Sequence, residues 1–220
     1  MIPGERILNQ FLDSELNVEN IWKPQMIRLV SKLHVRTMAS TCRIAVLQLT
    51  VTNDKKRNRD KCDQLLKKAA SYGAQVAFLP ECFDFIGESA KETSELAETI
   101  DKPDGLVDFY KQLAKDLNMS LSLGGFHHKN YKYDEEEMKS NNNKIGNMHI
   151  FINNQGQIEA TYNKTHLFDV EIPERGIRLK ESDYVLPGQS IVEPVSILPG
   201  SLFKLGLSVC YDMRCVLYKY

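Results

Sequence analysis

The sequence predicts an α/β fold built around a mixed sheet. Short apolar runs at residues 43–50, 74–80 and 119–126 alternate with two amphipathic stretches, at 53–73 and 105–118. Runs this short suit buried strands, because a core helix needs about ten residues or more. A strand, a helix and a second strand in this order imply parallel neighbours, whereas a later hairpin implies antiparallel ones.

Composition limits the classes of function. The 220 residues are enough for one domain, and 28 Lys and Arg residues nearly balance 29 Asp and Glu residues. Such a chain has no overall field to attract nucleic acid or an anionic membrane. No apolar run approaches the ~18 residues of a membrane-spanning helix. We therefore expect neither nucleic acid nor a membrane as a partner.

The first unit, residues 43–80, is predicted as strand, helix and strand. "RIAVLQLT" (43–50) is rich in apolar and β-branched residues and is expected to be a buried strand. Asn53 or Asp54 can cap the helix that follows, and Gly73 stands where a helix can end. The apolar stripe of this helix consists of Cys62, Leu65, Leu66, Ala69 and Ala70. "AQVAFLP" (74–80) then supplies a parallel strand.

The second unit repeats this order and then changes to hairpins. "GLVDFYKQLAKDLN" (105–118) predicts a helix and "MSLSLGGF" (119–126) a strand, followed by a polar loop. "NMHIFIN" and "QIEATY" flank Asn153-Asn154-Gln155-Gly156, whose turn chemistry predicts a hairpin. Two further strands are expected from "SIVEPVSIL" and "FKLGLSVC", with Pro199-Gly200 as the turn between them.

Residues 1–41 are expected to form an N-terminal extension before a domain at 42–220. "MIRLVSKLHVRTMAS" has no acidic residue, and its basic residues are spaced along one helical face, as is typical of a mitochondrial presequence. We predict that initiation at Met26 gives a mitochondrial form and initiation at Met38 a cytoplasmic one. The alternative is a tail without function.

Five scattered cysteines argue against both a disulfide framework and a zinc site. Their number is odd and no C-x-x-C pair occurs; they are Cys42, Cys62, Cys82, Cys210 and Cys215. We expect a reduced compartment, no metal, and a reactive role for any cysteine with a special function.

Three chemically complementary side chains follow predicted strands. Glu81 comes after "AQVAFLP", Lys164 after "QIEATYN" and Cys210 after "KLGLSV". Sites in α/β sheets gather at the carboxyl ends of strands. A thiol needs a base and a stabilising cation, because only a few per cent is ionised at neutral pH. The alternatives are a buried structural cysteine, a solvated loop glutamate and a surface lysine.

The chain resembles the nitrilase superfamily of carbon–nitrogen hydrolases. "FLPECFDFIG" (78–87), "YNKTHLFDVEIP" (162–173) and "GLSVCYDMR" (206–214) are similar to its three signature blocks, in the same order. "LSLGGFHH", "HLFDVEIP" and "CYDMR" are similar to the branch of deaminated glutathione amidases, which are sometimes fused to a histidine-triad domain. The resemblance implies an α-β-β-α sandwich with a mixed sheet, whose C-terminal part is expected to be missing here.

The resemblance also implies roles for the residues of the site. It implies Glu81 as general base, Lys164 as oxyanion stabiliser, Cys210 as nucleophile and the backbone N–H of Tyr211 as a second oxyanion donor. Glu181, in "GIRLKESD", best fits the family's second glutamate, with one extra residue intervening. No cofactor or metal is implied, and the histidines at 127, 128 and 166 are expected to line or support the site.

The implied reaction is hydrolysis of a small-molecule amide, with deaminated glutathione as the implied substrate and a thioester as intermediate. Full-length relatives are expected to be homo-oligomers. The chain ends ten residues after Cys210, where the family continues into further strand–helix units. The alternative function is therefore a catalytically impaired homologue that serves at most as an interaction fragment.

Overall fold

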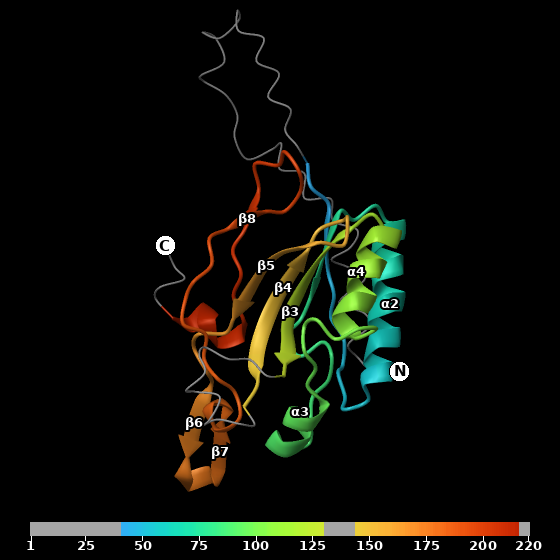
Figure 1. Ribbon diagram of the computed structural model, residues 1–220. Helices are drawn as coiled ribbons and strands as arrows, with labels where there is room; N and C mark the ends of the chain where they lie inside the picture. The colour runs from blue at the N-terminus through green and yellow to red at the C-terminus, as the bar shows by residue number, and fades with distance from the viewer. Residues whose placement is uncertain (1–40, 130–143, 216–220) are drawn as a thin grey trace, which may run out of the picture. The chain divides into compact units, whose positions relative to one another are not determined.

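A mixed five-stranded sheet forms the centre of the computed structural model, which describes residues 41–129 and 144–215. Its strands lie in the order β1-β2-β3-β4-β5 (Figure 1). β1 pairs parallel with β2 and β2 with β3, whereas β3–β4 and β4–β5 are antiparallel. The strands span Ile44–Val46, Val76–Leu79, Ser120–His128, Gly146–Ile152 and Ile158–Asn163. The predicted α/β class with a mixed sheet is thus confirmed.

Two helices pack on one side of this sheet (Figure 1). Asp54 caps α2 (Lys55–Ser71) by accepting a bond from the Arg57 N–H at 2.9 Å, and α4 spans Leu106–Asp116. Apolar side chains from these helices and from β2, β3 and β4 form one buried cluster. Its fully buried members include Cys62, Leu66, Tyr110, Ala114 and Ile150. Both helices lie where the apolar periodicity predicts them.

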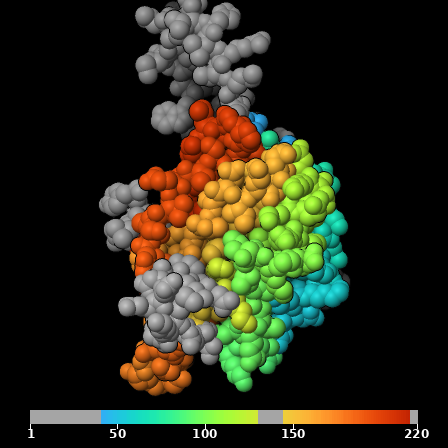
Figure 2. Space-filling view, viewed as in Figure 1, coloured from blue at the N-terminus to red at the C-terminus, as the bar shows by residue number. Residues whose placement is uncertain are grey.

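The opposite side of the sheet is partly covered by the C-terminal segment. Phe151 and Tyr162 of the sheet are buried against Ile197, Leu207 and Val209. Figure 2 shows this red segment lying along the orange strands. The packing brings the chain before Cys210 against the sheet, so the segment from 195 to 209 has a positioning role even where it forms little regular structure.

Several predicted elements differ from the structure. β1 is short, and Ile44 and Val46 are 53% and 78% exposed, so the expectation of a buried strand is wrong. "SIVEPVSIL" and "FKLGLSVC" contribute only β8 (Val195–Ser196) and β9 (Lys204–Leu205). These segments contain Pro194 and Gly206 and pair only with each other, which limits ladder formation. His127 and His128, expected in a loop, end β3.

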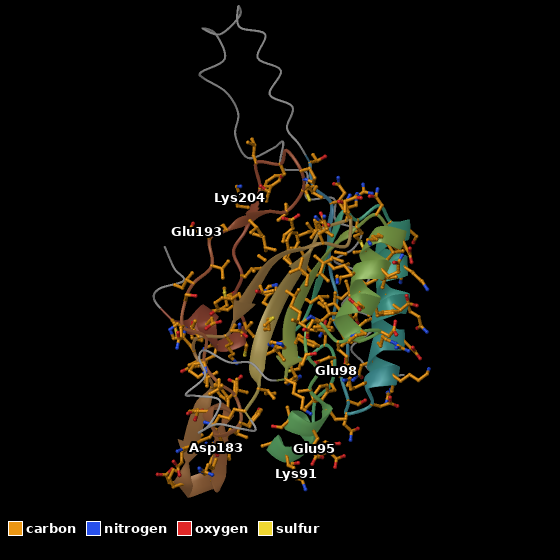
Figure 3. All side chains as sticks on the ribbon, viewed as in Figure 1. Lys91, Glu95, Glu98, Asp183, Glu193 and Lys204 are labelled. Carbon is orange, nitrogen blue, oxygen red and sulfur yellow. The ribbon has the colours of Figure 1, made fainter. Side chains whose placement is uncertain are left out.

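Two elements were not predicted. α3 (Ala90–Leu96) is capped by Ser89, and a small hairpin joins β6 (Asp169–Ile172) to β7 (Ile177–Lys180) through a 3-10 turn at Pro173–Arg175. After α3, Glu98 forms an ion pair with Lys55 and accepts a bond from the Leu106 N–H at 3.1 Å (Figure 3). This carboxylate joins the three helices.

The described residues all fall within one unit of the chain, Ser40–Tyr220. The predicted N-terminal extension and its presequence lie outside the described residues. Within 41–129 and 144–215 no helix has the length and apolar character needed to cross a membrane.

Candidate active site

The charged residues predicted from three separate blocks meet at one end of the sheet. Glu81 follows β2 by two residues, Lys164 directly follows β5, and Glu181 begins the 3-10 turn after β7. The Lys164 ammonium lies 3.1 Å from Glu81 Oε1 and 2.7 Å from Glu181 Oε2. The structure therefore brings Glu81, Lys164 and Glu181 into a single cluster.

Lys164 is almost completely buried, with a side chain 2% exposed. Burial disfavours its charge, but the hydrogen bond that it donates to Glu181 and the charges of both glutamates outweigh this and raise the pKa of Lys164. The lysine is therefore a permanent cation held between two carboxylates. A buried ammonium in such a position can stabilise a developing oxyanion.

A glycine pair allows the segment that carries Glu81 to approach the sheet. The register of β3 against β4 shifts between Leu123 and Phe126, at Gly124 and Gly125. A Cβ atom at Gly125 would lie 2.9 Å from Glu81 Cγ, and the Gly125 carbonyl accepts a bond from the Cys82 N–H at 3.0 Å. The bulge thus places Glu81 directly over β3.

Cys210 lies at this cluster but not at the end of a strand. It opens a 3-10 turn, Cys210–Arg214, and its φ of 46° is in the left-handed region that side chains rarely adopt. Burial, the charge of Glu81 and a hydrogen bond with Glu81 raise the pKa of Cys210 to about 11, and Lys164 offsets only part of this. Cys210 is exposed, and the charges of Glu81, Lys164 and Glu181 all act on its thiol.

Sequence comparison gives this cluster a family. Residues 43–220 match the family described as carbon-nitrogen hydrolase. This match covers most of the chain. The chain belongs to the carbon-nitrogen hydrolase family.

Named relatives of this carbon-nitrogen hydrolase are deaminated glutathione amidases. Those of Bos taurus and Homo sapiens are 41% and 43% identical over 197 residues, or 87% of this chain. These residues make up 56% and 57% of the two relatives, so the chain spans little more than half of their length.

Solved structures agree with the fold. The crystal structure of the C. elegans NitFhit protein is 36% identical with a TM-score of 0.65, covering 80% of this chain and 40% of that one. An amidase from Nesterenkonia sp. is 23% identical with a TM-score of 0.60, covering 79% and 57%. The second likeness concerns the fold alone. The central sheet therefore has the arrangement of the nitrilase fold.

Asp212 fixes the turn that carries the cysteine of this hydrolase. Its carboxylate is fully buried and accepts bonds from the Tyr162 hydroxyl at 2.8 Å and the Val209 N–H at 2.9 Å. It also accepts the His166 N–H at 3.0 Å and contacts His166 Nδ1 at 2.9 Å. These bonds join the turn to β5 and to the segment after Lys164, so they determine where Cys210 lies.

His149 of β4 holds the segment before Cys210. Its Nδ1 lies 2.9 Å from the Ser208 carbonyl oxygen, and its Nε2 lies 2.7 Å from Ser122 Oγ. Burial lowers the pKa of His149, and the bond to Ser208 offsets only part of this. A neutral ring fits both contacts, because Nδ1–H donates to the carbonyl while Nε2 accepts from the hydroxyl.

A second histidine lies behind Glu81. His127 Nδ1 is 3.0 Å from Asp84 Oδ1, and its Nε2 is 3.7 Å from Cys82 Sγ. Burial opposes the charge of His127, but Asp84 and Cys82 outweigh it and raise its pKa to about 10. Burial raises the pKa of Cys82, which remains a thiol beside this cation.

One contacting residue was missed by the sequence reasoning. Asn147 donates from Nδ2 to both glutamates, at 2.8 Å and 3.2 Å. A pattern in β4 could have indicated it, since Asn147 and His149 alternate with Met148 and Ile150 in a strand that is buried throughout. Two polar residues on one face of a buried strand indicate a polar site behind that face.

No set of three or more His, Cys, Asp or Glu side chains within 41–129 and 144–215 is arranged to hold a metal ion. The histidines at 127, 128 and 166 were expected to line or support the site. His127 and His166 bond to the carboxylates of Asp84 and Asp212, while burial lowers the pKa of His128.

Proposed function

We propose that the site formed by Glu81, Lys164 and Cys210 hydrolyses a carbon–nitrogen amide bond through a thioester. One observation carries the proposal: the buried Lys164 ammonium lies between the Glu81 and Glu181 carboxylates, and the charges of these three groups act on the Cys210 thiol. A nucleophile, a base and a cation in contact form the minimal set for acyl transfer.

The raised pKa of Cys210 defines the first step. At neutral pH only about one molecule in ten thousand holds a thiolate when the pKa is about 11. The proton must therefore leave as the sulfur attacks, and Glu81 is the proposed acceptor. The sulfur bonds to the amide carbon, and the carbonyl oxygen becomes an oxyanion near Lys164 and, we propose, the N–H of Tyr211.

Collapse of this intermediate breaks the carbon–nitrogen bond. Protonated Glu81 returns its proton to the nitrogen, ammonia leaves, and the acyl group remains on Cys210 as a thioester. Glu81, again a carboxylate, removes a proton from water, whose oxygen attacks the thioester carbon. The acid leaves and the thiol is restored, so one water is consumed for each ammonia released. Glu181 keeps Lys164 in place throughout.

The proposed substrate is deaminated glutathione. The relatives named deaminated glutathione amidase support it at 41% and 43% identity. The reacting group is then a terminal amide on a ketoglutaramate-type unit attached to cysteinylglycine. A small amide can reach the thiol directly, because Cys210 is exposed.

Ammonia release from deaminated glutathione tests the proposal. We expect the purified chain to release ammonia and Cys210→Ala to release none above background. Cys215→Ala is the matched control, since it removes a second thiol of the same turn region, and it should retain activity. Equal rates for the wild type and Cys210→Ala would contradict the proposal.

A second hypothesis is a homologue that retains the site but does not turn over. The chain matches little more than half of the length of its relatives, so a folded but inactive protein must be distinguished from an active amidase. Absence of ammonia release from the wild type, with a cooperative thermal transition, would favour it and remove the amidase proposal for this chain.

A further inference from the structure

Asn147 is the one residue of β4 that contacts all three charged members of the cluster. Its Nδ2 lies 2.8 Å from Glu81 Oε1 and 3.2 Å from Glu181 Oε1. Its backbone carbonyl accepts the Lys164 N–H at 2.9 Å. The amide orientation follows from the chemistry, because carboxylates only accept and the nitrogen must therefore face them. A single residue thus joins three segments that are far apart in the sequence, two through its side chain and one through its backbone.

The bonds to Glu81 select one of its oxygens. Asn147 Nδ2 and Lys164 Nζ both reach Oε1, at 2.8 Å and 3.1 Å. An oxygen that accepts two donors, one of them cationic, is a poor acceptor for another proton. Oε2 is therefore the oxygen of Glu81 that is left for a further donor.

The surroundings of Asn147 restrict it to this orientation. Its side chain is buried, with the residue 4% exposed, and its Oδ1 has no hydrogen-bond partner among the described residues. A Cβ at Gly125 would lie 2.9 Å from this Oδ1. Leaving a buried acceptor unpaired costs free energy, so the bonds of Nδ2 to the two carboxylates must offset that cost.

We propose that Asn147 is a positioning residue that holds Glu81 by Oε1, so that Oε2 is free for the Cys210 thiol, and holds Glu181 against Lys164. The role of Glu81 as base rests on the function proposed above, whereas the orientation of Glu81 against Cys210 does not. Asn147 touches neither the thiol nor the reacting carbon, so it acts through Glu81.

Alkylation of Cys210 tests the orientation without any turnover. Iodoacetamide forms a sulfur–carbon bond with the thiolate and releases iodide, so its rate against pH reports ionisation of the thiol. The charged groups facing Cys210 are Glu81, Glu181 and Lys164. Peptide mass spectrometry would follow Cys210 separately, and Cys62, which is fully buried, reports unfolding in the same sample.

In Asn147→Leu we expect Glu81 to move away from the thiol. The titration of Cys210 should then fall from about 11 toward the ordinary thiol value of about 8.5, as in Glu81→Gln. Alkylation at about pH 9 should become roughly tenfold faster, while kcat for ammonia release falls about tenfold to a hundredfold with little change in KM. Faster alkylation with slower catalysis separates loss of orientation from general damage.

Asn163→Leu is the matched control. Asn163 lies opposite Met148 on the neighbouring strand. Among the described residues its side-chain oxygen is also buried without a partner, and it has no hydrogen bond to either glutamate. In Asn163→Leu the thiol of Cys210 should titrate as it does in the wild type. If Asn147→Leu exposes Cys62, Asn147→Ser is used, since its hydroxyl can donate to only one carboxylate and should give a smaller shift.

The proposal fails if Cys210 titrates alike in the wild type, Asn147→Leu and Asn147→Ser, or if Asn163→Leu shifts it equally. A wild type without ammonia release would instead remove the amidase proposal, and the titration would still decide the role of Asn147.

Discussion

The carboxylate half and the thiol half of the site are held by different interactions. Lys164, Glu81 and Glu181 form ion pairs of 2.7 and 3.1 Å at the end of a five-stranded sheet. Cys210 follows a two-residue strand, and its segment is held by the Val209 N–H bond to Asp212 and by the bond of His149 to the Ser208 carbonyl. Charge stabilises the first half, whereas bonds to the main chain shape the second. Substitutions in the first should therefore mainly lower the free energy of unfolding, and those in the second should mainly displace the thiol.

The largest effect is expected from Lys164→Met. This change leaves Glu81 and Glu181 together without their cation, and breaking a buried pair on one side costs about 3–5 kcal/mol. Urea unfolding should show this loss, and ammonia release should disappear. Lys180→Met is the matched control, because its contact with Glu171 at 3.9 Å lies at the surface and contributes about 1 kcal/mol or less. Similar losses in both variants would remove the distinction between the two halves.

Asp212→Asn should act on the thiol half. An amide keeps one acceptor oxygen, so some of the donors from Tyr162, Val209 and His166 lose their partner. We expect a loss of about 1–3 kcal/mol in stability and a fall in kcat on the order of a hundredfold, since a displacement of about 1 Å has that effect. Asp183→Asn, at the exposed contact with Arg178, should change neither quantity. A drop in stability as large as that of Lys164→Met would contradict the comparison.

The sequence predicts the carboxylate half better than the thiol half. The elements that carry this half are specified by local patterns. The Asp54 cap marks the start of α2, which leads into β2. The turn that ends at Gly156, whose φ is 73°, specifies the β4–β5 hairpin. The end of the chain was predicted as two full strands, but β8 and β9 have two residues each. Burial against Phe151 and Tyr162 explains the apolar residues of that segment, and an apolar run cannot distinguish packing on a sheet from pairing within one.

Contacts between distant segments could not be predicted by local patterns at all. Glu181 was chosen by resemblance, and its contact with Lys164 depends on the β6–β7 hairpin, which returns the chain to Phe168. Asn147 alternates with His149 in β4, which indicates a polar face, but its contacts with the two glutamates form only when the strands are assembled. Such side chains become visible only in three dimensions.

The smallest effect expected is an opposite pH dependence of two histidines, one in each half. His149, whose pKa is lowered by burial, binds its proton more weakly in the folded than in the unfolded chain. The contribution of His149 to the free energy of unfolding is present above the ordinary histidine pKa of about 6.5 and is lost as the pH falls below that value. His127, whose pKa is raised to about 10, contributes fully below about 6.5 and loses its contribution as the pH rises toward 10.

Urea unfolding of the wild type, His149→Gln and His127→Gln between about pH 5 and about pH 9 measures both contributions. The stability difference between the wild type and His149→Gln should shrink toward the acidic end, and that for His127→Gln toward the alkaline end. His166, which is paired with Asp212 but 30% exposed, provides a comparison through His166→Gln. Parallel pH curves for His127→Gln and His149→Gln would mean that the His127–Asp84 ion pair and the neutral ring of His149 respond to pH in the same way. The contrast between the two halves of the site would then be wrong.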